Sequence, residues 1–251
     1  IVVVLHDMSL FLFFTTMLKT FIFPILMLAS TSLMNTQEER TFTPAELLGQ
    51  VDYASHPYFS VIPAEYTSKT QVYLRTETLD AFKKMFYAAK ECGLDLKIIS
   101  AARNFDYQKG IWERKWKDGK FIKHFGADRA KAIMRYSSMP GTSRHHWGTD
   151  IDINDLSDSY FMSNAEGKKV YEWLTTHANS FGFYQTYTSK ESGRTGYEEE
   201  KWHWSYMPIA KQLLEAYNTQ ISYKAIVNFN GYESAEPLGA IDLYVNGIDA
   251  N

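Results

Sequence analysis

The chain has 251 residues, of which 45% are hydrophobic and 22% are charged, and its formal net charge is −3 at pH 7. This composition predicts a packed core and excludes a largely disordered chain, which would have fewer apolar residues and a higher net charge. The slightly negative charge argues against a nucleic-acid partner, because such a partner requires a basic surface. The single cysteine, Cys92, excludes an intramolecular disulfide and a cysteine-rich structural zinc site.

The first 35 residues have the layout of a secretory signal peptide. Lys19 precedes a short apolar run over residues 21–29, and small residues at 29–32 offer a cleavage zone before a polar segment. The run is short for a membrane span, although an uncleaved anchor starting near Leu10 is the alternative. We therefore expect an exported protein, periplasmic or associated with the cell envelope, with residues 1–35 as signal peptide and upstream residues.

Residues 36–65 are aromatic and rich in turn formers, and we expect an irregular N-terminal arm there. Apolar residues at helical spacing predict helices over 79–92, 106–116, 127–136, 165–181 and 208–217. Short apolar or alternating segments predict strands over 72–74, 94–101, 148–154 and 201–207. The tail from residue 221 is expected to hold one more short strand and a final helix near 240–245.

Strands and helices mix along the chain without regular alternation, which predicts an α+β fold rather than a doubly wound α/β sheet. We expect a single domain over residues 66–251, tail included, with a small, mainly antiparallel sheet flanked by helices.

Histidines and carboxylates gather in the segment from Ser143 to Asp152. On a strand, Asp150 and Asp152 share one face, while the isoleucines between and after them point into the core. His145 and His146 precede this strand, so the segment supplies the ligand types that zinc prefers. Taken alone, it fits equally well a polar strand edge with surface histidines.

Two further clusters carry candidate chemistry. Glu200 lies three residues before His203 in an aromatic setting that includes Trp202, which resembles the base and ligand of a metallopeptidase. The alternative there is a solvated acidic run that meets a buried strand. Arg103 follows a predicted strand, where it can bind a carboxylate or a developing oxyanion, and a solvated arginine at a turn is the alternative.

Together the three clusters resemble the VanY-type D-alanyl-D-alanine carboxypeptidases, part of a metallopeptidase group that also includes the hedgehog signalling domain. The group's signature is Ser-x-His-x-x-Gly-x-Ala-x-Asp followed by Glu-x-x-His. The matching residues, in order, are Ser143, His145, Gly148, Asp152, Glu200 and His203. Arg103 and Gln108 match an arginine and a glutamine that the family carries upstream. The departure is Asp150, which stands where the signature has alanine.

The resemblance implies one zinc ion per chain, held in a cleft on the sheet by His145, Asp152 and His203. It implies that Glu200 takes a proton from the attacking water and later returns one to the leaving amine. Arg103 would stabilise the oxyanion or hold the substrate carboxylate.

We also expect specific roles or positions for five more residues. Ser143 and Gln108 are expected to contact substrate, and Trp202 to wall the pocket. Asp150 is a rival metal ligand, a group that tunes a neighbour, or a site for a substrate ammonium. His146 is the rival of His145 and is expected beside the ligands or at the surface.

The implied activity is hydrolysis of peptidoglycan stem peptides by a zinc metallopeptidase, foremost as a D-alanyl-D-alanine carboxypeptidase, with no obligate protein partner evident. A peptidoglycan endopeptidase of the same fold is one alternative, and Arg103 serves either enzyme. A non-catalytic zinc-containing binding module is another. Glu200 argues against that module, because a structural zinc site has no use for a base three residues before its ligand.

Overall fold

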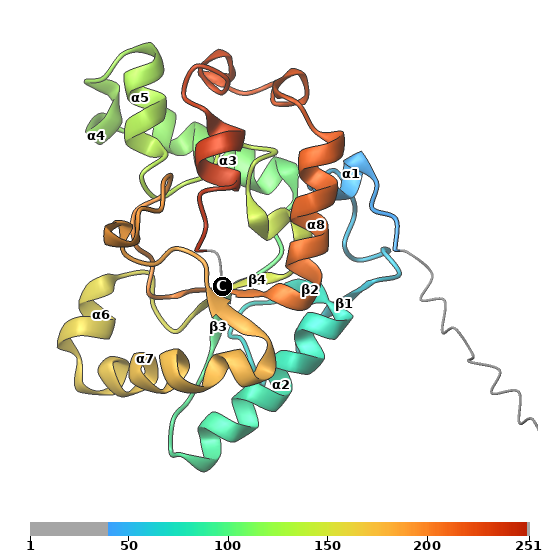
Figure 1. Ribbon diagram of the computed structural model, residues 1–251, viewed down its shortest axis with the longest axis vertical. Helices are drawn as coiled ribbons and strands as arrows, with labels where there is room; N and C mark the ends of the chain where they lie inside the picture. Colours follow the sequence, from blue (N-terminus) through green and yellow to red (C-terminus); the bar gives the residue numbers. More distant parts are fainter. Residues whose placement is uncertain (1–39, 250–251) are drawn as a thin grey trace, which may run out of the picture. The chain divides into compact units, whose positions relative to one another are not determined.

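Four short strands pair antiparallel in the order β3-β4-β6-β5 and form the central sheet (Figure 1). The strands are β3 (Ile98–Ser100), β4 (Asp150–Ile153), β5 (Phe183–Gln185) and β6 (His203–Tyr206). A second antiparallel sheet pairs β1 (Phe59–Val61) with β2 (Tyr73–Arg75). These small antiparallel sheets among helices confirm the predicted α+β fold.

The computed structural model describes residues 40–249, and the chain from Thr41 onwards forms one compact unit. The signal peptide expected over residues 1–35 lies outside the described residues. Among the residues that are described, no helix combines the length and apolarity that a membrane crossing requires.

The helices of the described chain vary from one turn to more than four. The α-helices are α1 (Pro44–Leu47), α2 (Thr76–Glu91), α3 (Phe105–Lys117), α4 (Gly119–Ile122), α5 (Gly126–Ile133), α6 (Asp158–Ser163), α7 (Ala165–His177) and α8 (Met207–Gln220). Short 3-10 helices include η1 (Arg144–Trp147), η2 (Ala178–Phe181), η3 (Lys190–Ser192), η4 (Tyr223–Ala225) and η5 (Tyr232–Ser234), and a π-helical segment, η6, covers Ala240–Val245.

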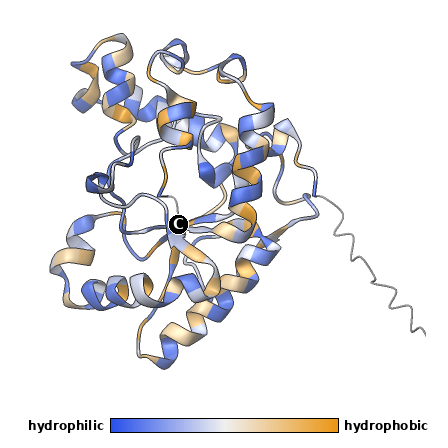
Figure 2. Cartoon of the chain, viewed as in Figure 1, coloured by the Kyte–Doolittle hydropathy of each residue, from blue (hydrophilic) through white to orange (hydrophobic). Residues whose placement is uncertain are grey.

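Helices cover the central sheet from two sides (Figure 1). On one side, α2 and α7 bury apolar side chains with Ile151 and Ile153 of β4, and we call this cluster the α2/α7 core. On the other side, α3, α5 and α8 pack with the C-terminal tail in a second cluster, the α3/α8 core. Figure 2 shows hydrophobic and hydrophilic residues intermixed along these helices, as in amphipathic helices with one buried face.

The segment expected to be an irregular arm contains regular structure. Thr43 caps α1 by accepting the amide N–H of Glu46, and the Glu46 side chain accepts the amide N–H of Thr43 in return. Phe42 and Leu47 bury themselves in the α3/α8 core, so this segment is packed onto the domain. The Thr-x-x-Glu pattern of a capping box is the sequence signal for this helix.

Most predicted helices and strands are confirmed, and the strand expected in the tail is wrong. Within the described tail, short helical segments follow residue 221 instead, and Ile226 and Phe229 fill the α3/α8 core. Gly231 has a φ of 78° and Asn228 a φ of 73°, so the backbone turns where a strand would stay extended. The final helix expected near 240–245 is the π-helical segment.

Candidate metal and catalytic site

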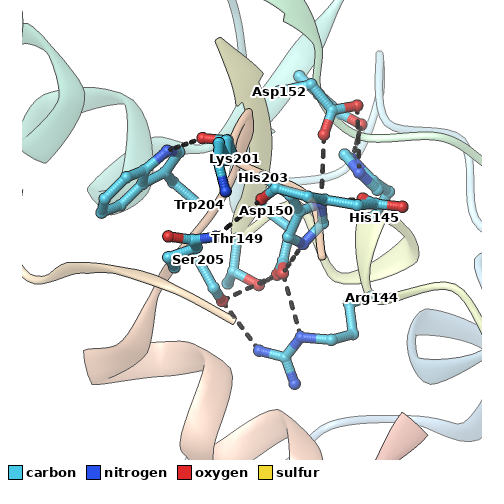
Figure 3. Close-up of polar contacts among 12 residues, drawn as sticks. Arg144, His145, Thr149, Asp150, Asp152, Lys201, His203, Trp204 and Ser205 are labelled. Carbon is cyan, nitrogen blue, oxygen red and sulfur yellow. Dashed lines mark hydrogen bonds and ion pairs between the residues drawn. The ribbon is translucent and has the colours of Figure 1, made fainter. Parts of the chain in front are cut away.

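Two adjacent strands bring a carboxylate and a histidine together. In the register of β4 and β6, Asp152 lies opposite His203. His145 joins them from η1, the helical turn that precedes β4. Asp152 Oδ2 lies 3.5 Å from His145 Nε2, and Asp152 Oδ1 lies 3.2 Å from His203 Nδ1 (Figure 3). The donor atoms of the three residues all lie within 4.8 Å of one another, and the side chains are buried.

The position of His145 depends on the turn that follows it. Gly148 ends η1 in the left-handed conformation, with a φ of 69°, which favours glycine. A Cβ atom there would lie 2.3 Å from Phe59 Cε1, so a larger residue does not fit. His145 Nδ1 donates a hydrogen bond to the Ala101 carbonyl oxygen at 2.9 Å, which leaves Nε2 free to face Asp152.

His203 lies between two carboxylates. Its Nδ1 faces Asp152, and its Nε2 donates to Asp150 Oδ1 at 2.9 Å, so Asp152 and Asp150 lie on opposite sides of the ring (Figure 3). Burial alone would lower the pKa of His203, but the hydrogen bonds to the two carboxylates outweigh burial and raise it to about 9. Asp150 therefore does not join the group of donor atoms that could hold a metal.

Glu200 stands beside this group. Its Oε2 is 3.8 Å from His203 Nδ1, and the residue is 7% exposed. Burial raises the pKa of Glu200 to about 8, and the charge of Asp152 acts in the same direction. A carboxyl group with a pKa near neutrality, next to a candidate metal site, can take up and release protons at physiological pH.

These groups open into a pocket of about 620 Å³ that Arg103, Gln108 and Trp202 also line. Three hydrogen bonds fix the backbone of Arg103: its N–H donates to the His145 carbonyl, and its own carbonyl accepts from Tyr53 Oη and His146 Nδ1. Within the described residues, Arg103 Nε has no hydrogen-bond partner. Because Arg103 also lines the pocket, its guanidinium can bind an anion there.

Gln108 and Ser143, both expected to contact substrate, have different positions. The Gln108 side chain donates to the Ser138 carbonyl at 2.8 Å, and its Oε1 has no partner among the described residues. Ser143 is buried, its hydroxyl has no hydrogen-bond partner among residues 40–249, and it is not among the residues that line the pocket. The substrate contacts of both remain predictions.

His146 is turned away from the metal-ligand group. It is 1% exposed, so the surface position considered for it is wrong. Its Nδ1 donates to the Arg103 carbonyl at 2.6 Å, and its Nε2 accepts the N–H of Gly141 at 3.0 Å. Burial lowers the pKa of His146 to about 3, so the ring is neutral and serves to hold two loops together.

Among the pocket residues that sequence reasoning missed are Lys115, Tyr187 and Tyr197. Lys115 could have been found, because it lies seven positions after Gln108 and so on the same face of α3. The two tyrosines come from loops beside β5 and β6, and the Tyr187 ring lies 4.5 Å from the His203 ring. No periodicity marks such loop residues.

The donors present suit a zinc ion. Two imidazole nitrogens and one carboxylate oxygen are typical protein ligands of catalytic zinc, which keeps a fourth position open. The hydrogen bond from His145 Nδ1 to a backbone carbonyl fixes the ring so that Nε2 is the free donor.

Comparison with known proteins identifies the family. Residues 71–209 match the family model VanY, described as D-alanyl-D-alanine carboxypeptidase. The chain belongs to this family. The VanY match includes both strands that carry the candidate ligands, together with η1 and Arg103.

Two curated relatives have carboxypeptidase names, in agreement with the VanY assignment. The Bacillus subtilis (strain 168) protein named "Putative carboxypeptidase YodJ" is 34% identical over 140 residues, which are 54% of this chain and 46% of that protein. A D-alanyl-D-alanine carboxypeptidase of Enterococcus faecalis (strain ATCC 700802 / V583) is 28% identical over 59% of this chain and 55% of its own length. The chain thus spans about half the length of these relatives.

The structure of the LdcB LD-carboxypeptidase is similar in fold. It has 26% sequence identity and a TM-score of 0.51, and the similarity covers 75% of this chain and 80% of that one.

Proposed function

We propose that this protein is a zinc-dependent peptidase that releases the C-terminal residue of peptidoglycan stem peptides, foremost those that end in D-Ala-D-Ala. The observation that carries the proposal is the buried group of His145, Asp152 and His203, with Glu200 beside it in one pocket. Membership of the VanY family supports the substrate class.

Zinc in this site would supply a Lewis acid that polarises the scissile carbonyl and makes water more acidic. Glu200, whose carboxyl lies beside the metal-ligand group, accepts the proton of the attacking water and returns one to the leaving amine. The guanidinium of Arg103, which lines the pocket, donates to the oxyanion that develops on the carbonyl, or to the substrate carboxylate.

The basic side chains that line the pocket favour a substrate with a free C-terminal carboxylate. Arg103 and Lys115 both line the pocket, and within residues 40–249 the Lys115 ammonium contacts Ser137 Oγ and no carboxylate. An endopeptidase, which cuts inside a cross-link, would not need a second cation at this place. A second pocket of about 510 Å³ shares four lining residues with the first, and it could hold the rest of a longer peptide; the shared residues are Lys69, Ser100, Arg103 and Tyr107.

The signal-peptide pattern of residues 1–35 supports action in the cell envelope, where this substrate lies. Cell fractionation with an antibody against the protein tests this location. Recovery of the protein in the cytosolic fraction alone would contradict it.

The activity is tested with three synthetic substrates read by mass spectrometry. These are a stem pentapeptide ending in D-Ala-D-Ala, a tetrapeptide ending in a single D-Ala, and a cross-linked dimer. We expect loss of one alanine from the pentapeptide, abolished by a chelator and restored by zinc. Cleavage of the tetrapeptide alone would change the proposed specificity, and cleavage of the dimer alone would favour the endopeptidase. Folded, zinc-loaded protein that cleaves none of them refutes the proposal.

Replacing the expected base tests the mechanism. Glu200→Gln should retain zinc and lose about 10² to 10⁴ in kcat, the usual contribution of a general base. The matched control is Glu199→Gln, because Glu199 is more exposed and pairs with Lys201 outside the metal-ligand group. Full turnover by Glu200→Gln would show that Glu200 is not the base.

A further inference from the structure

Asp150, the residue that departs from the VanY signature, is fully buried on the side of His203 that faces away from Asp152. We propose that Asp150 is a positioning residue that holds the His203 ring with Nδ1 toward the metal site. This inference rests on the proposed function, because it concerns how the chain presents a ligand to zinc.

The first argument is the geometry at His203. An imidazole can offer only one nitrogen to a metal, and the hydrogen bond made by the other nitrogen decides which one it is. Asp150 Oδ1 lies 2.9 Å from Nε2, and an ionised carboxylate only accepts hydrogen bonds, so Nε2 keeps its proton and does not bind the metal. Nδ1 is then the nitrogen on the side of Asp152 and Glu200.

The second argument is that Asp150 is itself fixed. Arg144 Nε donates to Asp150 Oδ1 at 3.1 Å, and the hydroxyls of Thr149 and Ser205 donate to Oδ2 at 2.6 and 3.1 Å (Figure 3). Each carboxylate oxygen is therefore satisfied, as a buried charge requires. A carboxylate held by so many donors cannot rotate away from His203.

The third argument is the set of contacts that the Arg144 side chain makes. Its Nη2 donates to Ser205 Oγ at 2.9 Å, and its guanidinium lies 4.7 Å from the Trp147 ring. Arg144 belongs to η1, which carries His145, whereas Ser205 belongs to β6, which carries His203. The pair of Arg144 and Asp150 thus connects η1, β4 and β6, the three elements that provide ligands. Alanine at the position of Asp150 would offer none of these contacts.

Zinc affinity is the direct test, measured by competition with a chromophoric chelator. Asp150→Ala should weaken zinc binding by about 10- to 100-fold, the usual effect of losing a group that orients a ligand. Asp150→Asn keeps an acceptor oxygen and should lie between Asp150→Ala and the wild type. Tyr217→Phe is the control for loss of a buried hydrogen bond, since Tyr217 donates to the Gly141 carbonyl outside the metal-ligand group, and it should bind zinc as the wild type does.

Cobalt substitution separates positioning from general loss of stability. The visible spectrum of the Co(II)-loaded Asp150→Ala protein should differ from that of the wild type, and the spectrum of Tyr217→Phe should not. Wild-type affinity and spectrum in Asp150→Ala would overturn the inference and leave the proposed function intact. A wild type that binds no zinc would refute both.

If Asp150→Ala does not fold, NMR spectroscopy of the zinc-loaded wild type tests the inference instead. Long-range ¹H–¹⁵N correlation spectra of the zinc-loaded protein should show a proton on Nε2 of His203 and on Nδ1 of His145. A zinc-loaded protein whose His203 carries its proton on Nδ1 would overturn the inference.

Discussion

Glu200→Gln has a consequence for stability that can be measured without substrate. Burial, with the charge of Asp152, raises the pKa of Glu200 from 4.5 to about 8 in the metal-free fold. In the unfolded chain the carboxyl has its ordinary pKa. Between these two values the folded protein therefore holds a proton that the unfolded chain has released. Glutamine has the shape of a protonated glutamate and does not titrate.

The sign and size of the effect follow from linkage. A raised folded-state pKa gives stability that is fully present below the unfolded pKa and is lost as the pH rises through the folded pKa. One such proton changes the free energy of unfolding by about 1.4 kcal/mol per pH unit. Between pH 5.5 and 7.5, titration of Glu200 should therefore lower the free energy of unfolding of the wild type by roughly 2 to 3 kcal/mol. Glu200→Gln lacks this titration and should not show that loss. For a domain of this size that is a difference of roughly 5 to 10 °C in Tm.

Urea unfolding of chelator-treated protein at the two pH values measures this difference. His203 adds a pH dependence of the same sign, because its pKa is also raised, but it does so in both proteins and cancels in the comparison. Glu199→Gln serves as the control for replacing a carboxyl by an amide and should follow the wild type. If the wild type and Glu200→Gln lose stability in parallel between the two pH values, Glu200 is not a protonated buried group and the reasoning is refuted.

Substitutions at three further positions, one of them with a matched control, have expected effects. Trp112→Ala empties a fully buried site and removes the hydrogen bond from Trp112 Nε1 to the Asn230 carbonyl. It should therefore lower the free energy of unfolding by about 3 to 5 kcal/mol in urea titrations. A loss below about 1 kcal/mol would contradict this packing. Gly148→Ala places a side chain with a left-handed backbone against Phe59, so it should lower the free energy of unfolding by at least about 1 to 2 kcal/mol and weaken zinc binding. The control Gly193→Ala has open space around it, so it should lower the free energy of unfolding only by the backbone strain and leave zinc binding unchanged. Arg103→Ala should lower kcat by about 10² to 10³ while retaining zinc, and an unchanged kcat would exclude it from stabilising the oxyanion.

The ends of the strands were harder to predict than their presence. Residues 94–101 have the composition of one strand, yet β3 covers only Ile98–Ser100. The preceding backbone is held by a side chain instead: Asn154 accepts the N–H of Lys97 at 2.7 Å and donates to the Asp95 carbonyl at 2.9 Å. A contact between residues so far apart in the sequence leaves no local pattern, so propensity alone overestimates this strand.

The site was predictable as far as local patterns reach. Alternation along β4 separates Asp150 and Asp152 from the isoleucines, which enter the α2/α7 core as expected. The meeting of Asp152 with His203 agrees with the ligand set implied by the VanY resemblance. The sequence left the role of Asp150 open between a metal ligand, a group that tunes a neighbour and a site for a substrate ammonium. That role depends on where the ring of His203 lies, which is determined by the register of β4 with β6.

That register also links the stability of the fold to the geometry of the site. β4 has Ile151 and Ile153 in the α2/α7 core and its two aspartates on the opposite face, next to His203. A slip of one residue would move the isoleucines out of the α2/α7 core and turn both aspartates away from the face of the sheet that carries His203. The burial of two isoleucines, at about 1.5 to 3 kcal/mol each, therefore opposes such a slip. It also holds the two carboxylates on either side of one imidazole, so the same packing that stabilises the sheet prepares His203 for its role.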